Sequence, residues 1–199
     1  MNECIFSSDR IYRYVLRCRC TPLFTETAST SPSAESNWHA AQYSDTPAFH
    51  HPALPDSRTR TKPSRIAWIG LNPSTADEMN LDQTLATVRR YSREWGFSEV
   101  VMLNLFAFRA TDPRDLKRAT DPIGPDNDEH LLTEVRNVDR VIACWGGQGR
   151  FLERDRQVSD LLNVSFECLL RNRTGAPHHP LYLKSRIRPK PFRLDQIRN

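Results

Sequence analysis

Residues 65–77 read RIAWIGLNPSTAD, an apolar run followed by a polar turn. The run from Ile66 to Leu71 predicts a strand that is covered on both faces in a parallel sheet. Asn72 and Pro73 then end the run. Because ligands bind beyond the carboxyl ends of the strands in open α/β sheets, we expect residues 72–77 to lie at a ligand-binding edge.

The pattern that follows alternates between helix and strand. Apolar residues at spacings of four, three, three and four mark one face of a helix: Leu81, Leu85, Val88, Tyr91 and Trp95. The other predicted elements are strands at residues 100–104, 141–145 and 165–170, and helices that begin at Asp112, at Asp126 and near Arg150. This alternation predicts an α/β fold, a three-layer α/β/α domain with a mainly parallel central sheet and right-handed crossovers.

The beginning of the chain differs in character from this region. Residues 4–20 nearly alternate, with β-branched and aromatic side chains, which predicts an N-terminal strand or hairpin within residues 1–20. Residues 21–64 are rich in Pro, Ser and Thr and lack a sustained period, so we interpret them as a flexible insertion. The predicted organisation is completed by an α/β core at residues 65–184 and a basic tail at residues 185–199.

The composition favours a protein without a membrane or metal partner. No apolar run approaches the roughly 20 residues that span a bilayer, and no signal pattern follows Met1, so we expect a cytoplasmic protein. The five cysteines are scattered without zinc-ligand spacing, so we expect free thiols, no metal and no cofactor. His39, His50 and His51 lie in the insertion, where solvated side chains and a metal cluster are the alternatives. The sequence carries no signal of the oligomeric state.

Positive charge is concentrated at the C-terminus. Residues 171–199 hold eight basic side chains and one acidic side chain, Asp195, whereas the whole chain has a net charge of +4. Such a segment can neutralise phosphates and release counterions, so DNA is a candidate partner. A solvated tail without a partner is the alternative.

Three polar residues follow predicted strands or occupy a strand-end turn: Asn72, Asn104 and His179. The carboxamide of Asn104 offers donors and an acceptor in one plane, which can match the edge of a pyrimidine. A histidine such as His179 can donate a hydrogen bond to a base oxygen as negative charge develops there. The alternative is that Asn72 and Asn104 only cap the segments that follow them.

Four motifs resemble those of the uracil-DNA glycosylase superfamily, in the same order and with similar spacing. They are GLNPS at residues 70–74, VMLN at 101–104, the strand and turn at 141–147, and HPLYL at 179–183. The resemblance implies that Asn72 orients the attacking water and that Asn104 reads the base edge. It also implies that Gly146 approaches the DNA backbone, that His179 supports the leaving base, and that Leu183 wedges into the duplex.

A closer resemblance is to the domain-of-unknown-function family 1643. The similar segments are residues 71–77, 104–111, 121–125 and 179–183. The long insertion before Arg65 departs from the compact beginning that is usual in this family.

The chain also departs from the most active glycosylases, which carry Asp where this chain has Asn72. An amide orients water but cannot accept its proton. Asp77 and Asp82 are the carboxylates nearby, and Asp77 is either a substitute general base or a cap for the next helix.

Two further groups have open interpretations. Phe106 and Phe108 are either a stacking platform for a base or part of the core. Arg109 either clamps a phosphate through its planar guanidinium or pairs with a surface carboxylate.

Three functions are consistent with these features. The first is hydrolysis of the N-glycosidic bond of a damaged or modified base in DNA. The second is a hydrolase or transferase on a free nucleoside, nucleotide or other small ligand. The third is a non-catalytic module that binds a modified base.

Overall fold

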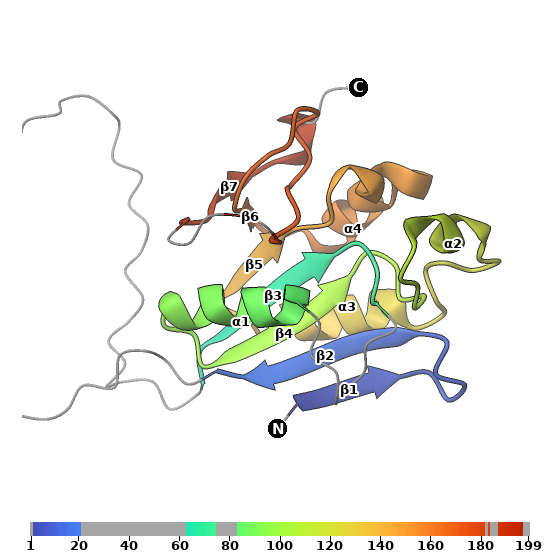
Figure 1. Ribbon diagram of the computed structural model, residues 1–199, viewed down its shortest axis with the longest axis horizontal. Coiled ribbons are helices and arrows are strands. Elements are labelled where there is room, and N and C mark those ends of the chain that lie inside the picture. The colour runs from blue at the N-terminus through green and yellow to red at the C-terminus, as the bar shows by residue number, and fades with distance from the viewer. Residues whose placement is uncertain (1, 21–62, 75–82, 182, 184–186, 197–199) are drawn as a thin grey trace, which may run out of the picture.

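A computed structural model describes residues 2–20, 63–74, 83–181, 183 and 187–196 (Figure 1). Nearly all of the predicted insertion, together with Asp77 and Asp82, lies outside these described residues.

The described residues form an α/β fold with seven strands and four α-helices, so the predicted fold class is confirmed at this level. The strands are β1 (Asn2–Phe6), β2 (Arg13–Arg19), β3 (Arg65–Gly70), β4 (Glu99–Asn104), β5 (Arg140–Ala143), β6 (Phe166–Cys168) and β7 (Lys190–Phe192). The helices are α1 (Gln83–Glu94), α2 (Pro113–Arg118), α3 (Asn127–Val135) and α4 (Arg154–Leu162), with 3-10 turns η2 (Gly147–Glu153) and η3 (Leu194–Gln196).

The sheet is mixed, so the prediction of a mainly parallel sheet was wrong. The strand order is β1-β2-β4-β3-β5-β6-β7. The four central strands β4, β3, β5 and β6 are parallel to one another, whereas β1, β2 and β7 pair in the antiparallel sense. Apolar runs and crossover helices indicate buried parallel strands. These features carry no information about the outer strands β1, β2 and β7, because antiparallel strands pair without a crossover helix.

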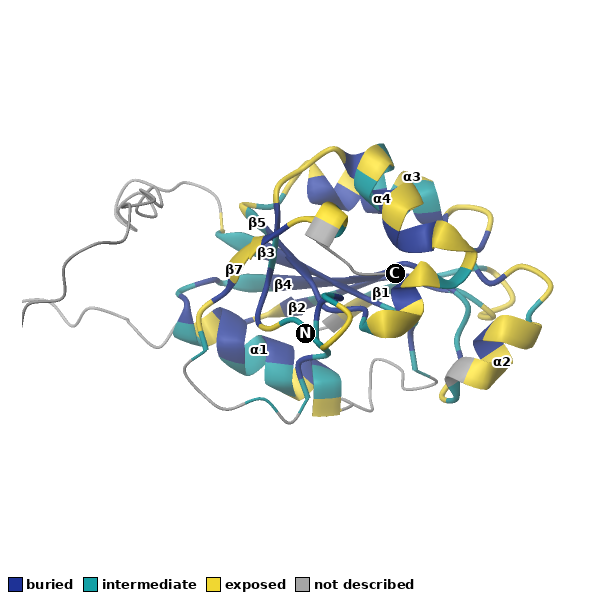
Figure 2. Ribbon diagram, turned by 90° about the horizontal axis from the view of Figure 1, so that it is seen from above, coloured by how far each residue is buried: buried dark blue, intermediate teal, exposed yellow. Residues whose placement is uncertain are grey.

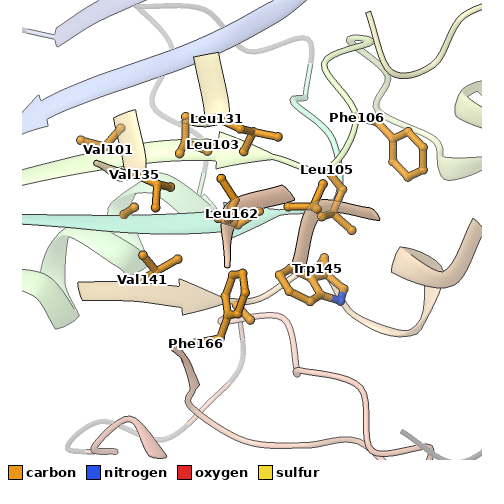
Figure 3. Close-up of a cluster of buried hydrophobic side chains, with 14 of the residues drawn as sticks. Val101, Leu103, Leu105, Phe106, Leu131, Val135, Val141, Trp145, Leu162 and Phe166 are labelled. Carbon is orange, nitrogen blue, oxygen red and sulfur yellow. The ribbon is translucent and has the colours of Figure 1, made fainter. Parts of the chain in front are cut away.

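Helices cover both faces of the sheet (Figure 2). Helix α1 lies on one face, where Leu85 and Val88 pack with the alternate strand residues Ile66, Trp68 and Val100. Helices α3 and α4 lie on the other face, over a second cluster of buried side chains (Figure 3). Strand residues therefore alternate between two apolar cores, as a sheet covered on both faces requires.

Both ends of the described chain extend the sheet. Strands β1 and β2 pair as an antiparallel hairpin, and β2 lies beside β4 through pairs such as Leu16 with Met102. Part of the predicted basic tail is the strand β7, in which Phe192 is buried and packs against Trp145 at a ring separation of 5.9 Å.

Local sequence explains where several elements begin. Asp112 caps α2, because its side chain accepts a hydrogen bond from the Arg114 backbone N–H, and Pro113 occupies the first helical position. Helix α3 begins at Asn127, after Asp126, with Asp128 and Glu129 in its first turn. In the described part of the chain, none of the helices has the length and apolar character needed to cross a membrane.

Candidate functional site

A pocket of about 240 Å³ opens at the carboxyl ends of β3 and β4. It brings together Asn72, Asn104 and His179, the three polar residues that the sequence predicts for a site. Its apolar walls include Leu16, Leu71, Leu85, Met102 and Trp145. The location agrees with the rule that ligands bind beyond the carboxyl ends of the strands.

Asn104 is the last residue of β4 and is only 2% exposed. It pairs with Gly70 of β3, and a Cβ on Gly70 would lie 2.9 Å from Asn104 Oδ1. The missing side chain at Gly70 thus makes room for the carboxamide. Among the described residues, neither Oδ1 nor Nδ2 of Asn104 has a hydrogen-bond partner, although the residue lines the pocket.

The amide of Asn72 holds two loops together. Its Nδ2 donates to the carbonyl oxygens of Pro73 at 3.1 Å and Ala110 at 2.8 Å, and the Ala110 N–H donates to Pro73 O at 3.0 Å. Asn72 therefore ties the turn after β3 to the loop that carries Ala110. Because both hydrogens of Nδ2 are used, Asn72 can contact a ligand or a water molecule by accepting a hydrogen bond at Oδ1.

His179 presents one nitrogen to its own loop. Its Nδ1 accepts a hydrogen bond from the Leu181 backbone N–H at 3.3 Å, so a neutral ring carries its proton on Nε2. Gly146, which has a φ of 72°, donates its N–H to the carbonyl oxygen of Pro177 at 2.9 Å. Gly146 thereby ties the turn after β5 to the segment that carries His179.

Three other predicted residues are placed away from the pocket. Phe106 is fully buried in the core (Figure 3). Its ring centroid lies 5.6 Å from that of Phe151. Arg109 Nη1 donates to the Arg10 carbonyl oxygen at 3.1 Å, beside the N-terminal hairpin. Leu183 packs against the apolar cluster on the α1 face. In the described part of the chain, none of these three lines the pocket.

A cysteine nucleophile and a metal site are two further kinds of chemistry that this edge of the sheet could offer. Burial raises the pKa of the Cys144 thiol, which donates to the Ile69 carbonyl oxygen at 3.3 Å, so this thiol is unsuited to act as a nucleophile. Within the described ranges, no group of three or more His, Cys, Asp or Glu side chains is arranged to hold a metal ion.

The sequence interpretation missed Arg13, which lines the pocket from β2 and is 5% exposed. Arg13 lies at the start of a strand in which Tyr14, Val15 and Leu16 are also buried. An arginine next to a run of buried residues was the one sequence signal that could have pointed to Arg13. Its place in the pocket could not be predicted, because it depends on the pairing of β2 with β4.

The comparisons with known proteins give a family. Neither a search of curated proteins nor a search of solved structures found a match. The family model described as "Protein of unknown function (DUF1643)" matches residues 56–181. This match covers well over half of the chain and includes β3, β4, β5 and His179, so the chain belongs to the DUF1643 family.

Proposed function

We propose that the pocket binds a nucleobase and that the chain hydrolyses the N-glycosidic bond of a damaged or modified base in DNA. The observation that carries this proposal is the carboxamide of Asn104, which lines the pocket, is almost fully buried and has no partner among the described residues. A carboxamide offers two donors and an acceptor in one plane. A ligand with a matching planar edge could bond to both.

The size of the pocket supports a small ligand. Pockets for drug-sized molecules measure about 300–1,000 Å³. The volume here, about 240 Å³, suits a single nucleobase better than a larger molecule. The apolar walls suit the faces of a flat ring, and the carboxamide suits its edge.

The proposed mechanism gives a role to three further side chains. His179, with its proton on Nε2, donates to a base oxygen as negative charge develops there. Asn72 Oδ1 orients the attacking water, and Asp77 accepts its proton as general base. The mechanism gives no role to Phe106, Arg109 or Leu183, which lie outside the pocket.

Two features support an action on DNA. The motifs resemble those of glycosylases, and helices on both faces of a sheet with a parallel centre are compatible with a glycosylase-like three-layer fold. Arg188, Lys190 and Arg193 are exposed beside or within β7, where they can contact phosphates.

A non-catalytic reader of modified bases is the second candidate. It is favoured by Asn72, because both hydrogens of its amide bind backbone carbonyls and the side chain cannot accept a proton from water. Such a reader would use Asn104 in the same way and release no base.

The test is an assay of purified protein on duplexes that carry uracil, mismatched or modified bases, followed by alkaline cleavage of abasic sites. Wild type should release one class of base, and Asn104→Ala should lose this activity. Asn137→Ala is the matched control, because Asn137 is exposed and bonds Thr133 O near the amino end of β5.

The other outcomes separate the candidates. Binding of one duplex without abasic product identifies the reader. Turnover of free nucleosides that is insensitive to salt identifies a small-ligand enzyme, since binding to DNA weakens steeply with salt. Failure to bind any duplex, base or nucleoside would contradict the proposed function.

A further inference from the structure

The two peptides that follow Asn104, Asn104–Leu105 and Leu105–Phe106, are held from the face of the sheet opposite α1. Asn127 Nδ2 donates to the carbonyl oxygens of Asn104 at 3.2 Å and Leu105 at 3.0 Å. Arg154 Nε donates to the same Leu105 oxygen at 2.9 Å. Asn127 and Arg154 are the first residues of α3 and α4, so two helices hold one strand end.

Both side chains are buried, which is expensive for polar groups. Asn127 is 1% exposed and Arg154 is 2% exposed. The guanidinium of Arg154 pairs with Asp128, a carboxylate that is half exposed. An ion pair with one half-exposed partner contributes little to stability by itself. The buried donors of Asn127 and Arg154 instead satisfy the carbonyl oxygens at the end of β4.

The same two peptides are bonded on their other side to the end of β3 and to Leu71, which follows it. The Leu105 N–H donates to the Gly70 carbonyl oxygen at 2.9 Å, and the Phe106 N–H donates to the Leu71 oxygen at 2.9 Å. A rotation of the Asn104–Leu105 peptide would swing the Cα–Cβ bond of Asn104 and move the carboxamide across Gly70. Asn127 opposes that rotation directly through the Asn104 oxygen, and Arg154 opposes it by holding the Leu105 oxygen of the next peptide.

We propose that Asn127 and Arg154 are positioning residues that hold the Asn104 carboxamide in the orientation that reads the base. This inference rests on the proposed function. A displacement of about 1 Å can cost about 100-fold in a reaction that depends on alignment. Loss of either positioning residue should therefore reduce base discrimination more than it reduces folding.

The first test needs no ligand. The carboxamide of Asn104 is followed by NMR and assigned from the signal pair that disappears in Asn104→Ala. In Asn127→Ala and Arg154→Met this pair should shift, broaden or split. Asp128 is exposed enough to be hydrated in Arg154→Met. Arg154→Lys, which retains the charge beside Asp128, covers the case in which Arg154→Met does not fold.

The control is Glu134→Gln. Glu134 is also buried and also bonds arginines, Arg17 and Arg65, but near the amino ends of β3 and β4. It should lower stability and leave the Asn104 signals unchanged. Unchanged Asn104 signals in Asn127→Ala and in the folded Arg154 variant would overturn the inference.

The second test measures base preference as the ratio of the dissociation constants for the best and second-best base. Asn127→Ala and the folded Arg154 variant should lower this ratio by about 10- to 100-fold, and Glu134→Gln should not change it. An unchanged ratio in the positioning variants would overturn the inference and leave the proposed function standing. Absence of any preference in wild type would instead refute the proposed function, and the NMR result would still decide the positioning.

Discussion

At the scale of single residues, the site depends on a contact between Gly70 and Asn104. The two residues are register partners in parallel strands, and the carboxamide occupies the space that a side chain at Gly70 would need. The glycine of the motif GLNPS therefore leaves the space that the Asn104 carboxamide of the neighbouring strand occupies. The contact between Gly70 and Asn104 could not be predicted from the sequence, because it depends on the register between β3 and β4.

Gly70→Ala tests this contact. The new Cβ would meet Asn104 Oδ1 and Met102 Cε at 2.9 Å. The methionine can move aside, but the carboxamide must turn. We expect a loss of about 1–3 kcal/mol of stability from overpacking and a loss of ligand affinity. Titration and thermal melting measure the two effects.

Gly147→Ala is the control for Gly70→Ala. A Cβ on Gly147 would meet Asn172 Nδ2 at 3.5 Å, which is ordinary contact. Equal ligand affinity in Gly70→Ala and Gly147→Ala would show that the carboxamide does not depend on Gly70.

At the scale of elements, α1 is fixed to the sheet by a polar link inside an apolar layer. Trp68 Nε1 donates to Ser92 Oγ at 2.9 Å, and Ser92 Oγ donates to Val88 O at 2.7 Å. Tyr91 and Trp95 stack around Trp68 with ring separations of 6.2 and 5.6 Å. Because Thr84 and Leu85 of α1 line the pocket, this link also places one of its walls.

Ser92→Ala should lower the free energy of unfolding by about 1–3 kcal/mol, because it leaves the buried indole N–H of Trp68 without its partner. Urea unfolding followed by circular dichroism measures the change. In a Trp68→Phe background, where the donor is absent, Ser92→Ala should cost much less. An equal cost in both backgrounds would contradict the link.

Helix α1 shows which buried residues a sequence pattern can predict and which it cannot. Of the five residues whose spacing predicts a buried helix face, Leu85, Val88 and Tyr91 are buried on α1 and Trp95 is buried just after it, because burial imposes the helical period directly. Leu81, the first of the five, lies outside the described residues. Ser92, which is fully buried, could not be predicted, because a serine in a helix resembles a surface residue until its tryptophan partner is known.

Strand pairing is a second feature that the sequence predicts only in part. Apolar runs identify β3, β4 and β5, and the rule for strand ends places Asn72, Asn104 and His179 together. The antiparallel neighbours β2 and β7 depend on contacts between distant parts of the chain, so local patterns do not specify them. Arg13 reaches the pocket through one of these pairings.

At the scale of the whole molecule, charges are arranged differently at the two ends of the sheet. Near the amino ends of β3 and β4, Arg17 and Arg65 pair with Glu134, and Arg65 also pairs with Glu99. The exposed basic side chains around β7 belong to the C-terminal segment that carries the excess of positive charge.

Replacing Arg188, Lys190 and Arg193 with glutamine should weaken DNA binding and flatten its salt dependence, by about one unit of log-log slope per lost phosphate contact. The fold should persist, because β7 pairs with β6 through its backbone. The matched control replaces three exposed arginines elsewhere, Arg19, Arg93 and Arg136. If both triple variants show the slope of wild type, the basic segment is only a solvated surface.

The central claim is that the carboxamide of Asn104 reads the edge of a base, and Asn104→Asp tests it most directly. The substitution keeps the size of the side chain and replaces two donors with acceptors. Titration of wild type and variant with the same panel of bases, beside melting curves, gives the preference of each. A bidentate contact is worth about 1–3 kcal/mol of discrimination, so the preferred base should lose about 10- to 100-fold in affinity relative to the others, and the melting curves report the cost of a carboxylate at this buried position. An unaltered order of preference in a folded Asn104→Asp protein would contradict the claim.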